Sequence, residues 1–120
     1  TFTDVTVESG LFSMFPTQAG VFRDFNNDGW LDIYIGNESY ENQYPSQLYI
    51  SNQNGTFTEV AEIAGCNVVG YIKGVNASDF NNDGLQDIVL SAFEGRAILK
   101  NIGVDQRGIP HFENITPTCG

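Results

Sequence analysis

Short apolar runs alternate with clusters of Gly, Asn, Asp and Ser along the whole chain, a pattern typical of an all-β protein. None of the runs keeps a helical period over ten or more residues. The pattern predicts two sets of four short strands. The first set lies at residues 20–25, 32–36, 47–52 and 57–61, and the second at residues 74–80, 87–91, 97–101 and 112–116.

The second strand of each set differs from the others because its apolar residues do not alternate with polar ones. Residues 33–35 and 88–90 are apolar throughout, which is typical of a strand buried on both faces. Between the third and fourth strands of the first set, Asn54 and Gly55 predict a tight hairpin, because both residue types tolerate positive φ.

Two sequence elements recur with the same period. The segments FTDVTVESG, FTEVAEIAG and FENITPTCG start at Phe2, Phe57 and Phe112, so the two intervals between them are equal. The segments DFNNDGWLDIYI and DFNNDGLQDIVL, which start at Asp24 and Asp79, are separated by the same interval. Two different elements with one period indicate an internal repeat.

Length differences between the two copies mark the loops. Residues 36–47 of the first copy correspond to the shorter segment 91–96 of the second, whereas residues 53–56 correspond to the longer segment 102–111. Surface loops tolerate such changes and packed strands do not.

Four short strands in a repeat of this length match the size of one blade of a β-propeller. We therefore predict β-propeller blades, with blade repeats at residues 20–65 and 66–120. Residues 1–19 would contain the outer strand of a preceding blade, at residues 2–6, and a linker.

The charge of the chain excludes several classes of partner. Asp and Glu number 15 against 5 Lys and Arg, giving a formal net charge of −10. This balance argues against nucleic acid and against anionic membrane surfaces. No apolar run is long enough for membrane insertion. A hydrophobic content of 41% argues against disorder.

Six of the acidic residues lie in two loops of equal length, residues 24–32 and 79–87. Oxygen-bearing side chains occupy loop positions one, three, five and nine, so that a curled loop can direct them at one centre. Gly29 and Gly84, at position six, permit the sharp turn. The candidate metal ligands are Asp24, Asn26, Asp28, the carbonyl of Trp30 and Asp32, and then Asp79, Asn81, Asp83, the carbonyl of Leu85 and Asp87.

Oxygen ligands in loose geometry favour Ca²⁺ over Mg²⁺, and we expect two Ca²⁺ per chain. The loops start like EF-hand loops, but the Glu required at position twelve is replaced by Ile35 and Leu90. Asp32 and Asp87 would then close the two sites. The alternative is a pair of ordinary polar turns, which does not explain three aspartates crowded twice at the same spacing.

The segments DFNNDGWLDIYIGN and DFNNDGLQDIVLSA resemble the FG-GAP repeat, also described as the VCBS or integrin-α N-terminal repeat. The segment QLYISNQNGTFTEVAEIAG is similar to hairpins of secreted repeat proteins with an ASPIC/UnbV-type ending. The resemblance implies propeller blades, a Ca²⁺ in each loop held by the candidate ligands above, and an extracellular, cell-surface or periplasmic location. Family loops often carry Asp where this chain has Asn26 and Asn81, which implies a lower affinity.

Similar propellers have about six to eight blades. Two blades cannot close a ring, so we expect a homo-oligomer or the remainder of a longer propeller chain. The chain starts at Thr1 without Met, and we expect a processed product or a fragment.

The function that this resemblance favours is a calcium-binding module for adhesion or for recognition of a protein or glycan ligand. A polysaccharide lyase or hydrolase and a purely structural repeat remain the alternatives. No enzyme is expected, because the only histidine, His111, has no catalytic pattern around it. The sequence leaves open whether Cys66 and Cys119 form a disulfide and whether Tyr40 and Tyr44 take part in recognition.

Overall fold

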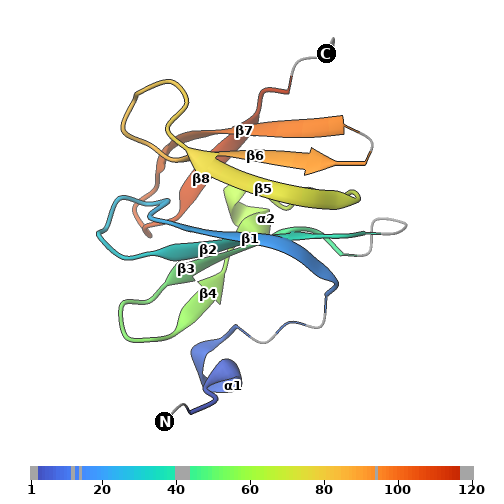
Figure 1. Cartoon of the computed structure of the whole chain (residues 1–120). Helices are drawn as coiled ribbons and strands as arrows, with labels where there is room; N and C mark the ends of the chain where they lie inside the picture. Colours follow the sequence, from blue (N-terminus) through green and yellow to red (C-terminus); the bar gives the residue numbers. More distant parts are fainter. Residues whose placement is uncertain (1–2, 12, 14, 40–43, 94, 117–120) are drawn as a thin grey trace.

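The chain forms two four-stranded antiparallel sheets in a computed structural model that describes residues 3–11, 13, 15–39, 44–93 and 95–116 (Figure 1). The first sheet has β1 (Thr17–Arg23), β2 (Asp32–Asn37), β3 (Gln47–Ser51) and β4 (Phe57–Glu59), in that order. The second has β5 (Ile72–Ser78), β6 (Asp87–Ala92), β7 (Gly95–Val104) and β8 (Pro110–Asn114), in that order. The prediction of an all-β protein with two four-stranded repeats is confirmed.

The register of the strands follows the sequence repeat closely. A bulge shifts the pairing of β1 with β2 between Thr17 and Ala19, and the same shift occurs between Ile72 and Gly74 of β5. The interval between the two bulges equals the period of the sequence repeat. The pairing of the first two strands is therefore the same in both sheets down to a local irregularity of the backbone, whereas the register shift between Asn101 and Gly103 of β7 has no counterpart in the pairing of β3 with β4.

The hydrophobic core lies between the two sheets. It is built from buried side chains of both sheets and of the connection between them, namely Phe25, Tyr34, Leu48, Ile50, Val60, Ala61, Ala64, Cys66, Ile72, Ala77, Ile88, Leu90, Leu99 and Phe112. On β2, Tyr34 is fully buried while Ile33 and Ile35 are half-buried on the other face. Burial on both faces is therefore present on β2, but it is unequal.

Gly36 of β2 marks a close approach of the two sheets. A Cβ at this position would lie 2.5 Å from Cγ2 of Ile72 and 2.8 Å from Cγ2 of Val75, both on β5. The equivalent residue of the second repeat, Ser91, is exposed. A side chain is thus excluded at Gly36, where the other sheet packs. It is allowed at Ser91, where no other sheet of the described chain packs.

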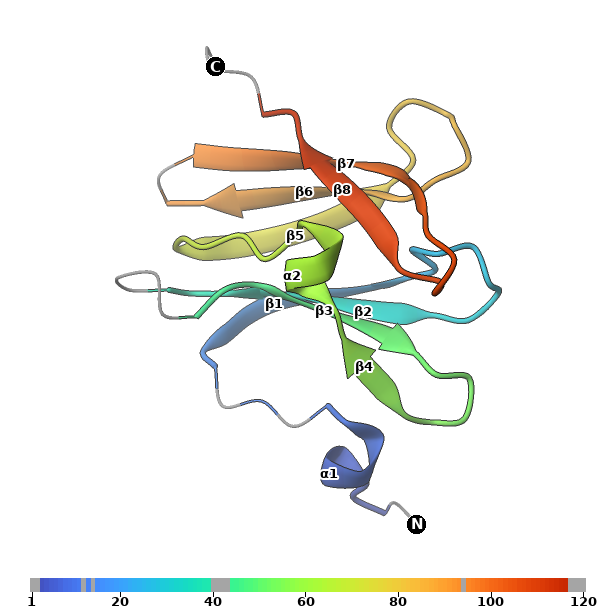
Figure 2. The same cartoon turned by 180° about the vertical axis from the view of Figure 1, so that it is seen from behind.

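Two four-residue helices, α1 (Thr6–Ser9) and α2 (Ala61–Ala64), occupy parts of predicted strands. α2 lies where the two sheets come together (Figure 2). The strand predicted at residues 2–6 is wrong for the described residues 3–6, since Thr6 already begins α1. The strand predicted at residues 57–61 ends at Glu59, whose carboxylate accepts hydrogen bonds from the amides of Leu48 and Ala61, both at 2.9 Å.

A left-handed glycine ends each helix and packs against an outer strand. Gly10 has φ of 82° and Gly65 has φ of 76°. A Cβ on Gly10 would lie 2.5 Å from the carbonyl oxygen of Phe57 in β4, and one on Gly65 would lie 3.0 Å from that of Phe112 in β8. The first two of the three repeated segments, which end at Gly10 and Gly65, therefore include a helical turn that fits closely against the last strand of a blade.

The hairpins between the third and fourth strands differ from the predictions in detail. In the first sheet the positive φ values fall at Gln53 and Gly55, because Asn54 uses its side chain to accept a hydrogen bond from the amide of Thr56 at 3.0 Å. In the second sheet the predicted loop 102–111 shortens to residues 105–109, since β7 continues to Val104 and β8 begins at Pro110.

Asp105 organises that second hairpin. Its carboxylate accepts hydrogen bonds from the amide of Arg107 at 2.8 Å and of Ile109 at 3.2 Å. It also pairs with Nε2 of His111 at 2.8 Å and with Arg107. The contact with His111, followed by that with Arg107, holds the pKa of Asp105 well below its usual range. His111, predicted as a loop residue, therefore lies on β8 in a polar network.

Candidate metal centre

The two predicted loops connect the first and second strands of each sheet and fold in the same way. In the first loop, Asp24 accepts hydrogen bonds from the amides of Asp28 at 3.1 Å and Gly29 at 2.8 Å. In the second, Asp79 accepts from the amides of Asp83 at 3.0 Å and Gly84 at 2.7 Å. The carboxylate at position one therefore holds the loop curled around itself.

The backbone at positions four and six is left-handed in both loops. Asn27 and Asn82 have φ of 56° and 60°, and Gly29 and Gly84 both have φ of 86°. The predicted role of the glycines in the sharp turn is confirmed. The left-handed Asn at position four was not predicted, although Asn is among the residue types that tolerate this conformation.

The aspartate at position five accepts a hydrogen bond from the residue two positions later. The Trp30 amide donates to Oδ1 of Asp28 at 2.9 Å, and the Leu85 amide donates to Oδ1 of Asp83 at 3.0 Å. Each of these aspartates has a further partner on the third strand or the hairpin that follows it. Gln53 donates to Oδ2 of Asp28 at 3.1 Å, and this contact was not predicted.

In the second loop the corresponding partner is the ammonium group of Lys100. Nζ of Lys100 lies 3.3 Å from Oδ2 of Asp83. The amide of Leu85, followed by Lys100, lowers the pKa of Asp83. Neither Gln53 nor Lys100 could be found from the loop motif, since their approach depends on the register of β2 with β3 and of β6 with β7.

The closing aspartates, Asp32 and Asp87, are the first residues of β2 and β6 and are almost completely buried. Asp32 accepts hydrogen bonds from the amides of Phe25 at 3.0 Å and Ser51 at 2.9 Å. Asp87 accepts from the equivalent amides of Phe80 at 3.1 Å and Asn101 at 2.8 Å. These carboxylates tie each loop to the third strand of its sheet.

Burial raises the pKa of Asp32 to about 6, against the opposing effect of its two backbone hydrogen bonds. The negative charges of Asp28 and Asp24 add to the increase. In Asp28 itself burial opposes ionisation, but hydrogen bonds from Trp30 and Gln53 lower the pKa. The first loop therefore concentrates negative charge around a buried carboxylate, which a cation would neutralise.

The aspartates of the second loop come close enough together to share one ion. One ligand oxygen from each of Asp79, Asp83 and Asp87 lies within 4.8 Å of the others. Within the described residues, the corresponding aspartates of the first loop do not make this mutual approach. Asp79, Asp83 and Asp87 are thus the members of the predicted ligand set that the structure brings together.

In the first loop a different feature fits a bound cation. Asn26, at position three, is 9% exposed, and its Oδ1 is buried without a hydrogen-bond partner among the described residues. A buried acceptor without a donor is costly, and a hard cation coordinated by oxygen would satisfy it. The candidate ligand atoms of both loops are all oxygens, which fits Ca²⁺.

The model of the FG-GAP-like repeat matches residues 24–90, which begin at the first loop, include the second and end in β6. This is more than half of the chain. The chain belongs to the FG-GAP-like repeat family. None of the curated proteins matches the chain.

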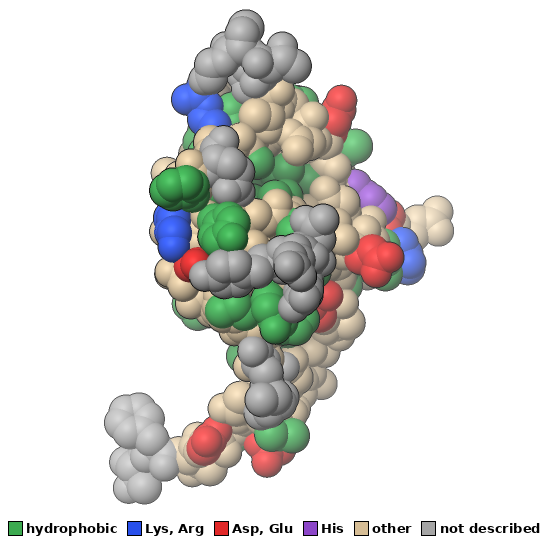
Figure 3. Space-filling view, turned by 90° about the vertical axis from the view of Figure 1, so that its right-hand side faces the viewer, with side chains coloured by type: hydrophobic (Ala, Val, Ile, Leu, Met, Phe, Trp, Pro, Cys, Tyr) green, Lys and Arg blue, Asp and Glu red, His purple; other side chains and the backbone are tan. Residues whose placement is uncertain are grey.

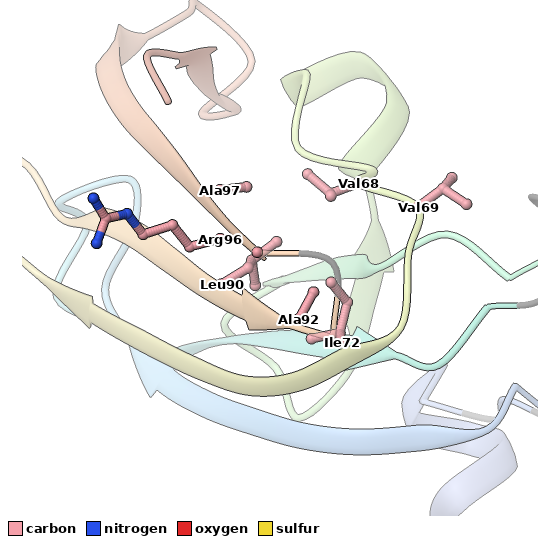
Figure 4. A pocket seen from close by; sticks show the side chains of 8 residues that line it. Val68, Val69, Ile72, Leu90, Ala92, Arg96 and Ala97 are labelled. Atoms are coloured by element: carbon pink, nitrogen blue, oxygen red, sulfur yellow. The ribbon is translucent and has the colours of Figure 1, made fainter. Parts of the chain in front are cut away.

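Two hollows of this FG-GAP-like repeat chain lie away from the loops. A cavity of about 150 Å³ on the second sheet is lined by apolar side chains such as Val68, Leu90 and Ala97, with Arg96 as its charged residue (Figure 4). A hollow of about 310 Å³ is lined by Tyr71, Lys73 and Phe93. Figure 3 shows hydrophobic side chains grouped on one face of the molecule.

Several predictions fall on residues that the structure does not describe. Cys66 is buried, but Cys119 lies outside the described residues, so the possible disulfide stays a prediction. Tyr40 also lies outside them, whereas Tyr44 packs against Phe15 with ring centroids 5.3 Å apart.

Among the described residues, no helix combines the length and the apolar character that a bilayer crossing requires.

Proposed function

We propose that this FG-GAP-like repeat chain is a calcium-binding β-propeller module for adhesion or for recognition of a protein or glycan, in which Ca²⁺ is structural. The observation that carries the proposal is the convergence of Asp79, Asp83 and Asp87, whose oxygens lie within 4.8 Å of one another. The same loop occurs a second time with the same hydrogen bonds, which supports two sites per chain. No catalytic activity is assigned to the chain.

Each site would take side-chain oxygens from loop positions one, three, five and nine and the carbonyl oxygen of position seven. The first set is Asp24, Asn26, Asp28, Trp30 and Asp32, and the second is Asp79, Asn81, Asp83, Leu85 and Asp87. A bound Ca²⁺ would supply the positive charge that lets the three crowded carboxylates of a loop ionise together. Two Ca²⁺ would change the formal charge of the chain from −10 to −6.

The calcium affinity expected of the two loops suits the calcium concentration outside the cytosol. Each has three carboxylates and one amide among its ligands, and Lys100 offsets part of the charge in the second loop. Fewer charged ligands weaken calcium binding, and extracellular modules work with Kd values of about 10⁻⁴–10⁻³ M. An extracellular, cell-surface or periplasmic location is therefore part of the proposal.

One face of the second sheet is left uncovered within the described chain, and this supports association with another blade. Phe80, Ile98 and Ile115 line a largely apolar hollow of about 240 Å³ on this face. We propose that another blade covers it, either from a second copy of the chain or from elsewhere in a longer propeller. Ligand recognition would then depend on the loops of the assembled ring.

The proposal is tested by thermal unfolding and calorimetric titration of the chelator-stripped chain with Ca²⁺ and, separately, with Mg²⁺. At a free Ca²⁺ concentration of about 100 times the Kd, one site stabilises the fold by ~2.7 kcal/mol, which raises Tm by roughly 10 °C or more. The matched control is the double variant Asp24→Asn, Asp79→Asn, which removes one charge from each loop. Melting curves unchanged by Ca²⁺ in the wild-type chain would overturn the proposal.

A further inference from the structure

The first loop is held by the second blade through the side chain of Asn26. Nδ2 of Asn26 donates a hydrogen bond to the carbonyl oxygen of Gly108 at 2.8 Å, across 82 residues of sequence. Gly108 belongs to the hairpin between β7 and β8, which Asp105 organises. The nitrogen end of the Asn26 amide is thus fixed by the second blade, and the oxygen end is the buried acceptor without a partner among the described residues.

Two further amides join the same parts of the molecule. Nδ2 of Asn27 donates to the carbonyl oxygen of Gly84, at position six of the second loop, at 3.1 Å. Nδ2 of Asn101 donates to the carbonyl oxygen of Phe25, at position two of the first loop, at 3.0 Å. Asn101 is fully buried, and its own backbone amide donates to the closing carboxylate of the second loop.

The contact with Gly108 requires a side chain that can donate a hydrogen bond, as the amide of Asn26 does. A carboxylate has no proton to donate, so Asp at this position would place a charged oxygen against the Gly108 carbonyl. Asn81 occupies the same position of the second loop but is exposed. The same residue type is therefore held by a neighbouring blade in one loop and faces solvent in the other.

We propose that the second blade holds Asn26 in position for the cation of the first loop, so that cation binding in this loop and docking of the second blade reinforce each other. The inference rests on the proposed function, since it concerns the same cation. Coupling of this kind is reciprocal. Docking of the second blade raises the affinity of the first loop for the cation by some factor, and bound cation raises the equilibrium constant for docking by the same factor.

The test is calorimetric Ca²⁺ titration of the full chain carrying Asn26→Asp or Asn81→Asp. Variants of the first loop are measured with the second loop silenced by Asp79→Asn, and variants of the second loop with the first silenced by Asp24→Asn. Asn81→Asp adds a charged ligand at an exposed position and is expected to bind Ca²⁺ more tightly. Asn26→Asp is expected to bind about tenfold more weakly, because it loses the bond to Gly108.

A pair of glycine variants keeps the test decisive if Asn26→Asp does not fold. Asn27→Gly and Asn82→Gly both retain the left-handed backbone, but Asn27→Gly also removes the bond to Gly84. We expect weaker Ca²⁺ binding in the first loop for Asn27→Gly and no matching loss in the second for Asn82→Gly.

The outcomes separate the two proposals. The inference would be overturned if Asn26→Asp and Asn81→Asp raised the Ca²⁺ affinity of their loops equally, or if Asn27→Gly and Asn82→Gly changed it equally. Either result would leave the calcium sites in place. A wild-type chain that binds no Ca²⁺ would overturn both.

Discussion

Phe25 and Phe80 occupy the same position in the two repeats, yet Phe25 is fully buried whereas 49% of Phe80 is exposed. The second blade covers Phe25, which meets Phe112 of β8 edge-on with ring centroids 6.1 Å apart. Phe80 lies instead on the open face of the second sheet. The contact between the two blades therefore serves as a template for what would cover Phe80.

We predict that Phe80→Glu abolishes self-association of the chain, because a charge on this face cannot be buried against another blade. Light scattering after size-exclusion chromatography measures the effect. Val7→Glu, at another exposed apolar position, is the matched control and should leave the mass unchanged. A Phe80→Glu variant that associates like the wild type would contradict a second copy on this face.

Asp87→Ala should lower the free energy of unfolding by about 2–4 kcal/mol, because it leaves the buried amide of Asn101 and the partly buried amide of Phe80 without an acceptor. Asp87→Asn keeps one acceptor oxygen and should cost less stability. Both variants should lose Ca²⁺ binding in the second loop. Urea unfolding with and without Ca²⁺ separates the two roles, and an Asp87→Asn variant that is still stabilised by Ca²⁺ like the wild type would exclude Asp87 as a ligand.

The metal-free chain should become less stable as the pH rises from about 4 to about 6. The pKa of Asp32 is raised by burial from 3.8 to about 6, so the folded chain binds more protons than the unfolded chain in this window. The contribution is fully present below pH 3.8 and is lost as the pH passes 6. Urea unfolding in chelator across this range checks the slope, which should become flatter in Asp32→Asn.

Gly36→Ala should destabilise the chain by about 1–3 kcal/mol, because the added methyl group would overlap Ile72 and Val75 of β5. Gly20→Ala on β1 is the control, since its Cβ would meet other atoms only at ordinary contact distances of 3.6 Å or more. Comparison of the urea midpoints tests the prediction. Equal losses in both variants would point to backbone effects rather than to the contact between blades.

The sequence predicted the repeat, the strands and the loops well because the same pattern was present twice. Recurrence of two separate elements at one interval distinguishes a curled DFNNDG loop from an ordinary turn and places each loop between two strands. The FG-GAP-like repeat identity and the antiparallel blades are confirmed, while occupancy of both loops by Ca²⁺ stays a prediction.

The elements that the sequence did not predict depend on contacts rather than on local pattern. The helices α1 and α2 have four residues each, too few to show a helical period. Lys100 approaches Asp83 only because of the pairing of β6 with β7. The bond from Asn26 to Gly108 joins the first loop to the far hairpin of the next repeat, which no pattern within either segment indicates.

The contacts of Gly10 with Phe57 and of Gly65 with Phe112 have a consequence for synthesis of the chain. Each glycine is made before the four strands of its blade, but it packs against the last of them. On a ribosome that adds about 5–20 residues per second, the turn at Gly10 would wait roughly 2–9 s for Phe57 to be made. Blades should therefore mature one at a time during translation, each completed only when its outermost strand leaves the exit tunnel.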